Sequence, residues 1–391
     1  MRIAYLALIE LDVPNACLIH TREIAENMAL LGHEVDLFLP KPLQPISRWA
    51  GIKHHWVRFW GFDELRRFFF MVECCLRLIR QHYRKKFDIL YMRELADPLL
   101  IVHCCRWLKL PYFVKLNGWA LDELAMSNPA GEALERMEKR QQLLFGNATG
   151  IISSTQGNAA NVIRHYGVPE DRVTVQELGV NGDMFGKLGK REAREALHLD
   201  MDARYLLFAG SFHPHHDLST LIRSLAIAKL AIPDLQLLLV GDGAERVRSE
   251  QWVQEEGLQA SVHFMGAHPY EQMPTWFAAA DIFMIPLLKR RIALQNGCFV
   301  TKLWEALAAK VPVIITDLPQ TSSYGVLEDK AWIVPPEDAA AMAAAVQALL
   351  CSPSTIEISR IERAYHYVLQ ERSWRREAQQ TIDFITQKLY V

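Results

Sequence analysis

Short apolar runs alternate with segments of helical period through the first half of the chain. The helical segments begin with residues 19–31, whose apolar positions recur three and four residues apart. The apolar runs are continuous, as in strands that are buried on both faces, and they lie at 3–8, 35–39, 89–92, 112–116, 150–153 and 172–175. Strands separated by helices usually pair in parallel, so we predict a parallel sheet with helices on both faces.

The second half repeats this rhythm after a glycine-rich stretch at 179–186, which we interpret as a break between domains. Strands are predicted at 205–208, 235–240, 262–265, 282–285, 311–315 and 332–334. Helices are predicted at 190–197, 218–230, 244–256, 273–280, 339–350, 357–369 and 374–390. The pattern therefore predicts an α/β protein of two doubly wound domains with a cleft between them.

The length of the chain agrees with two domains, and its charge argues against a general affinity for nucleic acid. The chain has 391 residues, half of them apolar, which is enough for two cores. The formal charge of −2 gives no general attraction to nucleic acid, so an anion site must be local. The first apolar run reads as a strand rather than a secretion signal, and no window is as apolar as a membrane span. The loop after it lacks a G-x-G-x-x-G fingerprint, which argues against a dinucleotide.

The seven cysteines indicate a reducing compartment. They include the adjacent pairs Cys74-Cys75 and Cys104-Cys105, no C-x-x-C spacing occurs, and the total is odd. Such a pattern favours free thiols over a disulfide framework. We therefore expect a cytoplasmic protein, with the inner face of the membrane as a second location to consider.

A stretch from 49 to 86 mixes aromatic with basic residues and has two interpretations. Its aromatics include Phe68, Phe69 and Phe70, and its bases include Arg58, Arg66, Arg67, Arg77, Arg80, Arg84, Lys85 and Lys86. A basic amphipathic segment can lie on an anionic membrane, which would give a peripheral contact. Aromatics at helical spacing more often pack into a core, so we favour a core helix with a basic outer face.

Candidate chemistry centres on residues 297–316, where a polar loop, a helix start and a buried strand follow one another. Lys302 and Glu305 are three residues apart and therefore share one face of the helix. Thr301 is predicted to cap this helix, whose first amides, with Lys302 beside them, would attract a phosphate. Glu305, one turn further, can accept hydrogen bonds from sugar hydroxyls. A solvated Lys–Glu pair on an ordinary helix is the alternative.

Three further polar positions could contact a ligand. His216 ends a histidine-rich turn that begins at His213, and we favour hydrogen bonding to a phosphate over a metal site, because no cysteine or carboxylate accompanies it. Asn117 could bond a substrate hydroxyl or shape the turn before Gly118. Gly241 follows a strand and either admits a ligand close to the backbone or turns the chain, and we favour the turn.

Taken in order, five segments resemble the retaining glycosyltransferases of the GT-B fold, family 4. They are 239–243 (LVGDG), 262–266 (VHFMG), 280–286 (ADIFMIP), 301–305 (TKLWE) and 312–317 (PVIITD). The resemblance implies two Rossmann-like domains, with an acceptor-binding domain at 1–180 and a nucleotide-sugar-binding domain at 181–372. It also implies a C-terminal helix at 373–391 that crosses back to pack on the first domain.

The same resemblance assigns roles to residues of the second half, and several positions depart from the family pattern. Glu305 matches a glutamate that holds the ribose hydroxyls, but Gly297 stands where a first glutamate is usual. Ser211 and His216 stand where an arginine and a lysine usually bind the diphosphate, which leaves Lys302 as the best phosphate cation. The donor-binding residues so implied are Glu305, Lys302, Thr301, Gly210, Ser211, Gly241, Gly266, Ala267, His268, Cys298 and Phe299.

The implied activity is transfer of a sugar from a nucleoside diphosphate of UDP or GDP type to a hydroxyl of a glycan, lipid or small molecule, with retention of configuration. Lys302, His216 and Asn117 would be catalytic, with the basic residues 289–291 as a second source of positive charge. The resemblance implies no metal ion, no other cofactor and no nucleic acid partner. A nucleotide-sugar epimerase and a non-catalytic partner subunit are the alternatives, the second because of the departures named above.

Overall fold

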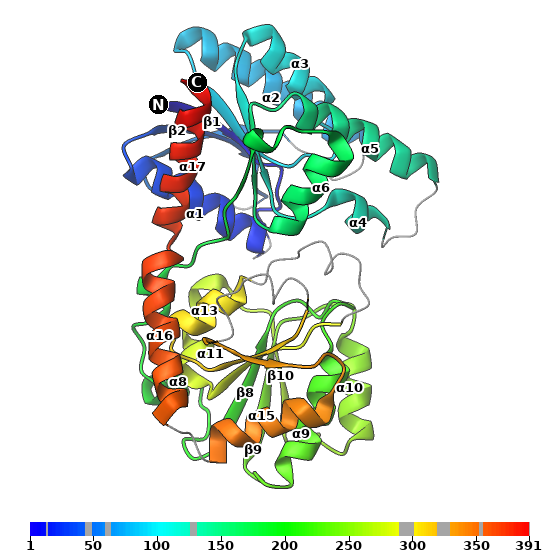
Figure 1. Cartoon of the computed structure of the whole chain (residues 1–391), viewed down its shortest axis with the longest axis vertical. Helices are drawn as coiled ribbons and strands as arrows, with labels where there is room; N and C mark the ends of the chain where they lie inside the picture. The colour runs from blue at the N-terminus through cyan, green and yellow to red at the C-terminus, as the bar shows by residue number, and fades with distance from the viewer. Residues whose placement is uncertain are drawn as a thin grey trace. The chain divides into compact units, whose positions relative to one another are not determined.

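The computed structural model describes residues 1–12, 15–43, 49–58, 64–125, 131–288, 301–318, 329–351 and 355–390. These residues form two compact units (Figure 1). The first unit consists of residues up to 178 together with the C-terminal segment from Trp374, and the second consists of the described part of 179–373. The last helix therefore belongs to the first unit, although the chain reaches it only after completing the second.

Seven parallel strands form the sheet of the first unit, in the order β3-β2-β1-β4-β5-β6-β7. Their bounds are β1 Arg2–Leu6, β2 Glu34–Pro40, β3 Ile52–Val57, β4 Ile89–Arg93, β5 Tyr112–Leu116, β6 Gly150–Ser153 and β7 Val173–Val175. The helices are α1 Ala16–Leu30, α2 Glu64–Arg84, α3 Leu99–Leu108, α4 Ala120–Ala125, α5 Gly131–Gly146, α6 Gln156–Tyr166 and α17 Trp374–Leu389. Alternate residues of the central strands enter two apolar clusters, so the sheet is buried on both faces.

Six parallel strands form the sheet of the second unit, in the order β10-β9-β8-β11-β12-β13. Their bounds are β8 Arg204–Ala209, β9 Leu235–Val240, β10 Val262–Gly266, β11 Ile282–Ile285, β12 Val313–Thr316 and β13 Trp332–Val334. The helices are α7 Gly182–Phe185, α8 Lys190–Ala196, α9 Leu218–Lys229, α10 Arg246–Glu255, α11 Met273–Ala279, α13 Lys302–Ala308, α15 Ala339–Cys351 and α16 Thr355–Glu371. The predicted fold class is confirmed, and in each sheet the strand order reverses beside β1 or β8, where such sheets bind ligands.

Strand β3 is the strand of the described sheets that the sequence pattern does not predict. It is an edge strand that pairs only with β2, and polar side chains interrupt its apolar alternation. One of these, His55, is nevertheless buried, because its ring stacks on Phe38 at 4.6 Å and bonds to Asp36. His55 counts as a polar position in the hydrophobic pattern although it is buried, so the pattern does not predict the strand.

Helix α17 packs on the first unit through one apolar face. Trp374, Ala378, Ile382 and Ile385 are buried in the apolar cluster that contains β1 and β2 side chains. Figure 1 draws this helix beside α1, against which it packs. The four buried positions recur at intervals of three and four, as an amphipathic helix requires.

The described cysteines and helices bear on the compartment and on membrane contact. Cys17, Cys74, Cys75, Cys104, Cys105 and Cys351 are free cysteines. Across the described ranges, no helix combines the length and the apolar character needed to cross a bilayer.

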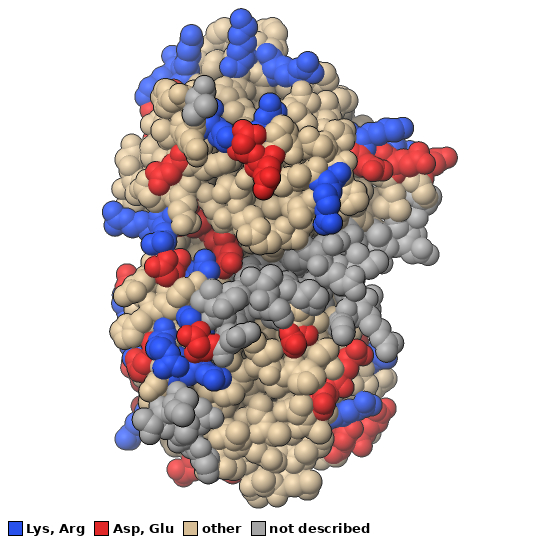
Figure 2. Space-filling model, in the orientation of Figure 1, with Lys and Arg blue, Asp and Glu red and all other residues tan. Residues whose placement is uncertain are grey.

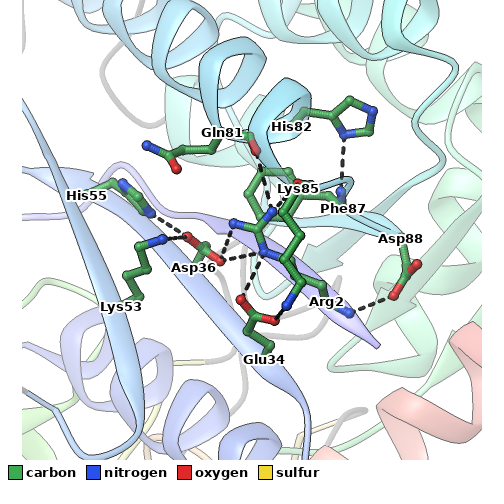
Figure 3. Close-up of polar contacts among 10 residues, drawn as sticks. All are labelled: Arg2, Glu34, Asp36, Lys53, His55, Gln81, His82, Lys85, Phe87 and Asp88. Carbon is green, nitrogen blue, oxygen red and sulfur yellow. Dashed lines mark hydrogen bonds and ion pairs between the residues drawn. The ribbon is translucent and has the colours of Figure 1, made fainter.

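A charged network closes the amino-terminal edge of the first sheet (Figure 3). Arg2 bonds Asp36 at 3.0 Å and Glu34 at 3.1 Å, and Lys85 also pairs with Glu34. The Nε2 atom of His55 lies 2.5 Å from Oδ1 of Asp36. Burial opposes ionisation of Asp36, but the His55 hydrogen bond and the Arg2 charge outweigh it, so the pKa of Asp36 lies below its usual value. Because ligands bind at the opposite, carboxyl edge of such sheets, we interpret this network as structural.

We expect Glu34→Gln to lower the free energy of unfolding by less than about 1 kcal/mol, although Glu34 makes two ion pairs. Its carboxylate is largely exposed, so water replaces much of the lost attraction. Urea denaturation of the variant beside the parent chain measures the change. A loss of several kcal/mol would mean that the ion pairs of Glu34 stabilise the fold as strongly as those of a buried carboxylate.

Candidate functional site

The loops that follow β8, β9 and β10 meet through backbone contacts at the carboxyl edge of the second sheet. The Gly210 amide donates to the Val240 carbonyl at 2.9 Å, and the Gly241 amide donates to the Gly266 carbonyl at 2.7 Å. A β-carbon added to Gly241, whose φ is +143°, would lie 1.8 Å from the Gly210 carbonyl oxygen. This contact between two loops by itself requires a glycine at position 241.

His216 lies in the loop after β8 and faces a backbone carbonyl. Its Nδ1 is 2.7 Å from the Ser211 oxygen, so Nδ1 carries the proton and donates. Burial lowers the pKa of His216 to about 4, although the Ser211 carbonyl favours the charged ring. The neutral ring therefore presents Nε2 as an acceptor. His216 can donate to a phosphate through Nε2 only if its ring takes up a second proton when the ligand binds. The sequence alone does not show this requirement.

Helix α13 carries the predicted cation and carboxylate in its first turn. The Nζ atom of Lys302 lies 3.2 Å from Oε2 of Glu305. The Glu305 side chain is 7% exposed and the Lys302 side chain is 24% exposed. A buried carboxylate is costly unless paired, so Glu305 is not a solvated surface residue, and Lys302 supplies its partner. Because α13 leads directly into the parallel strand β12, its first turn points toward the carboxyl edge of the sheet.

Thr301 does not cap this helix as predicted. Its backbone is already helical, with φ −54° and ψ −34°, and its side chain makes no capping hydrogen bond. A capping residue needs a non-helical backbone to bring its side-chain oxygen onto the first amides. The predicted phosphate site therefore rests on Lys302 rather than on free amides beside Thr301.

The remaining donor-site candidates of the second unit are only partly described. Ser211 and Ala267 are exposed, and Gly266 has a left-handed backbone with φ +77°. The ring of His268 is held by local partners, with Nδ1 at 2.9 Å from Oε1 of Gln272 and Nε2 at 3.1 Å from a carbonyl. Outside the described residues lie Cys298, Phe299, Gly297 and the basic run 289–291.

The histidine-rich turn gives no sign of a metal centre. The Nδ1 atoms of His213 and His215 lie 2.7 Å apart, which is a hydrogen-bond distance between a protonated and an unprotonated nitrogen. Within the described part of the chain, no group of three His, Cys, Asp or Glu side chains is arranged to hold a metal ion.

In the first unit, Asn117 and Arg93 meet at the carboxyl ends of the neighbouring strands β5 and β4. With its amide oxygen toward Arg93, Asn117 accepts from both terminal guanidinium nitrogens, at 2.7 and 3.1 Å, and donates to Oγ of Ser154 at 2.6 Å. Arg93 also donates to Nδ1 of His20 at 2.9 Å and to Sγ of Cys17 at 3.2 Å. All these partners are neutral, and no described carboxylate lies within ion-pair distance of the guanidinium. The guanidinium is therefore held by neutral partners at the carboxyl edge of the sheet.

Behind Arg93, a buried ion pair joins this sheet to α17. The Nζ atom of Lys115 lies 2.8 Å from Oε1 of Glu377, and Nε2 of His20 lies 3.3 Å from the same oxygen. All three side chains are buried. Burial lowers the pKa of His20 to about 4, although the Glu377 hydrogen bond opposes the shift. Neutral His20 therefore donates to Glu377 and accepts from Arg93, so Glu377 orients His20 and His20 positions Arg93.

The sequence pattern does not indicate Arg93, His20 or Glu377 as site residues. Arg93 carries a readable signal, because a charged residue ends a buried parallel strand at the edge where ligands bind. His20 and Glu377 carry none, since each is a polar residue on an amphipathic helix and only the fold makes them neighbours, 357 positions apart in sequence.

Family models of glycosyltransferases match both halves of the chain. Residues 189–365 match the family model of the glycosyl transferases group 1, and residues 19–183 match that of glycosyltransferase family 4. The D-inositol 3-phosphate glycosyltransferase of Thermomonospora curvata is 27% identical over 323 residues, covering 75% of this chain and 72% of that protein. Its counterpart in Paenarthrobacter aurescens is 24% identical, and the alignment spans only 44% of that protein.

Solved structures of glycosyltransferases share the fold. Sucrose-phosphate synthase from Thermosynechococcus elongatus superposes with a TM-score of 0.77 at 22% identity, covering 98% of each chain. Anabaena HepE in complex with UDP and glucose superposes with a TM-score of 0.76 at 15% identity, covering 98% of this chain and 99% of that one. The two doubly wound units and these likenesses place the chain in the class of proteins with the GT-B fold. Within that class, the two matched models show that it belongs to family 4.

Proposed function

We propose that this glycosyltransferase moves a hexosyl group from a nucleoside-diphosphate sugar of UDP or GDP type to an acceptor hydroxyl, with retention of anomeric configuration. The observation that carries the proposal is the pairing of the partly exposed Lys302 with the buried Glu305 in the first turn of α13. The solved complexes of Anabaena HepE with UDP and with UDP-glucose support the donor class.

Lys302 and Glu305 divide the work of holding the donor in this proposal. Negative charge gathers on the diphosphate as its bond to the sugar carbon breaks, and the Lys302 ammonium stabilises it. Glu305 accepts hydrogen bonds from the ribose hydroxyls. The acceptor oxygen bonds to the sugar carbon on the face that the phosphate leaves, and its proton passes to a phosphate oxygen. No metal ion or other cofactor takes part, and no protein base is required.

We assign the acceptor to the first unit, at Asn117 and Arg93. Asn117 is held by Arg93 and Ser154, which fixes its amide at the edge of the sheet. The amide would bond an acceptor hydroxyl, and the Arg93 guanidinium would bond an oxygen of the same molecule. The product would be a glycan, glycolipid or other glycoconjugate made on the cytoplasmic side of the membrane.

The donor proposal is tested by thermal stabilisation with UDP, GDP, ADP and CMP. One nucleotide should stabilise the chain selectively, because a ligand at a hundred times its dissociation constant adds about 2.7 kcal/mol to the stability of the native state. Lys302→Ala and Glu305→Ala should each abolish that response. Arg191→Ala and Glu195→Ala remove an exposed ion pair on α8 and should leave it intact.

Turnover separates an enzyme from a non-catalytic relative. With a nucleotide sugar and a pool of acceptors, the enzyme releases nucleoside diphosphate, whereas a partner subunit binds the nucleotide without releasing it. Stabilisation by none of the four nucleotides would overturn the donor proposal outright. Conversion of one nucleotide sugar into its epimer would assign the chain to the epimerase alternative.

A further inference from the structure

Helix α2 exposes a long apolar stripe in addition to its buried face. Its buried side is made by Phe70, Met71, Cys74 and Leu78. Phe69, Leu76 and Tyr83 recur at intervals of seven and are 59%, 62% and 70% exposed, and Leu65 on the same side is 65% exposed. At 1.5 Å per residue, the stripe from Phe69 to Tyr83 is about 21 Å long. Packing against the core accounts for the apolar residues of the buried face. It does not account for those of the exposed stripe.

The stripe continues onto the neighbouring helix α3. Trp107 is 62% exposed, and its ring meets that of Tyr83 edge to face at 6.2 Å. Tryptophan and tyrosine carry a polar atom on an apolar ring, which suits the boundary between lipid and water. The sequence interpretation of a core helix is therefore correct for one face of α2 and incomplete for the other.

Cations border the stripe. On a helix of 3.6 residues per turn, Arg80 and Arg84 fall directly beside the line from Phe69 to Tyr83, and Arg106 and Lys109 flank Trp107. All four are exposed, and none has a carboxylate within ion-pair distance among the described residues. Figure 2 shows several Lys and Arg side chains at the top of the view, where Figure 1 draws α2 and α3. Glu73, which also borders the stripe, pairs with Arg77 at 2.6 Å, so the net charge of the named side chains beside the stripe is positive.

We propose that this surface binds an anionic phospholipid bilayer. We define it as the α2–α3 face: Leu65, Phe69, Leu76, Tyr83 and Trp107, with Arg80, Arg84, Arg106 and Lys109. A helix lying in the interface plane sinks its apolar side among the headgroups while long basic side chains reach the lipid phosphates. A second copy of the same face would bring like charges together, so charge complementarity favours lipid over self-association. This inference is independent of the proposed sugar transfer.

The test is sedimentation of the intact chain with vesicles of phosphatidylcholine alone or mixed with phosphatidylglycerol. We expect binding to the mixed vesicles that weakens as salt is added. The variant Arg80→Gln/Arg84→Gln/Arg106→Gln should lower partitioning about a hundredfold, from roughly fivefold for each cation near an anionic surface. The variant Phe69→Ser/Leu76→Ser should bind neither vesicle.

Matched controls carry the same changes in the second unit. Leu230→Ser/Val247→Ser alters two exposed apolar residues, and Arg191→Gln/Arg223→Gln/Arg248→Gln alters three exposed arginines. Both controls should bind like the parent chain, and circular dichroism melting checks that every variant is folded. Equal binding to both vesicle types, or unchanged binding in the α2–α3 variants, would overturn the proposal. Absence of vesicle binding together with a dimer that Phe69→Ser/Leu76→Ser dissociates would identify the face as a contact between copies instead.

Discussion

Lys302→Gln should lower kcat for sugar transfer by about a hundredfold or more, the usual loss when one group that stabilises developing oxyanion charge is removed. Glutamine is preferable to alanine here, because its amide can still donate to the buried carboxylate of Glu305, which lies 3.2 Å from Lys302 Nζ. The loss therefore reports the missing charge rather than a collapsed helix turn. Lys302→Arg, which keeps a cation in a different shape, should recover part of the rate.

Glu305→Gln provides the contrast that identifies the two roles. Glu305 is proposed to hold the donor ribose in ground and transition state alike, so its loss should raise KM for the donor more than it lowers kcat. Steady-state kinetics of both variants, with the donor varied at saturating acceptor, gives the two parameters separately. Equal reduction of kcat by Lys302→Gln and by the α8 control Arg191→Ala would mean that Lys302 does not contact the phosphate.

The architecture could be predicted from sequence because burial on both faces leaves continuous apolar runs. Every described strand except β3 is predicted within a few residues, since parallel strands covered by helices admit few polar side chains. Strand β3 fails the same test, because His55 is buried by pairing with Asp36 and not by being apolar. The pattern of apolar residues thus predicts strands whose side chains are apolar. It misses a strand whose buried polar side chains are hydrogen-bonded.

The candidate site could be predicted only where its residues are close in sequence. Lys302 and Glu305 share a helix face at a spacing of three, and the structure brings them together. Thr301 fails as a cap because capping depends on backbone angles, which residue type suggests but does not determine. The residue type of His216 predicts that its ring donates a hydrogen bond to a phosphate. The Ser211 carbonyl takes the Nδ1 proton, so Nε2 of the neutral ring is an acceptor.

The cluster behind Arg93 lay beyond prediction for a topological reason. Lys115 and Glu377 are 262 positions apart, and they meet because α17 returns to the first unit. The resemblance to family 4 does imply that crossing, and the spacing of the buried apolar residues on α17 fits it. Neither says that the crossing helix brings a carboxylate to a buried lysine.

Glu377→Ala should lower the free energy of unfolding by about 3–5 kcal/mol, as expected when one partner of a buried ion pair is removed. Lys115 is fully buried, and its remaining hydrogen bond is to the Gln176 carbonyl at 3.2 Å. Burial already lowers the pKa of Lys115, although Glu377 opposes the shift, and without Glu377 the pKa should fall further. Urea denaturation of the variant at neutral pH measures the loss.

The pH dependence of that loss identifies its cause. We expect Lys115 of the variant to lose its proton at a lower pH in the folded chain than in the unfolded chain, where its ordinary pKa is 10.5. Since the unfolded state binds more protons, the stability of Glu377→Ala should rise as the pH is raised from 7 toward 10. The pKa of Glu377 in the parent chain is lowered, because Lys115 and His20 outweigh the effect of burial, so its contribution is present above 4.5 and is lost as the pH falls through the folded value.

The double variant Lys115→Met/Glu377→Leu separates the ion pair from the packing around it. Replacing both charges with apolar side chains removes the unpaired ion, so most of the stability lost in Glu377→Ala should return. His20 then lacks the carboxylate that orients its ring, and Arg93 loses the fixed position of its His20 partner. A stable double variant with a raised KM for the acceptor substrate would assign Glu377 a positioning role in the first unit. If Glu377→Ala instead costs as little as Glu34→Gln, the buried pair does not hold α17 to the sheet.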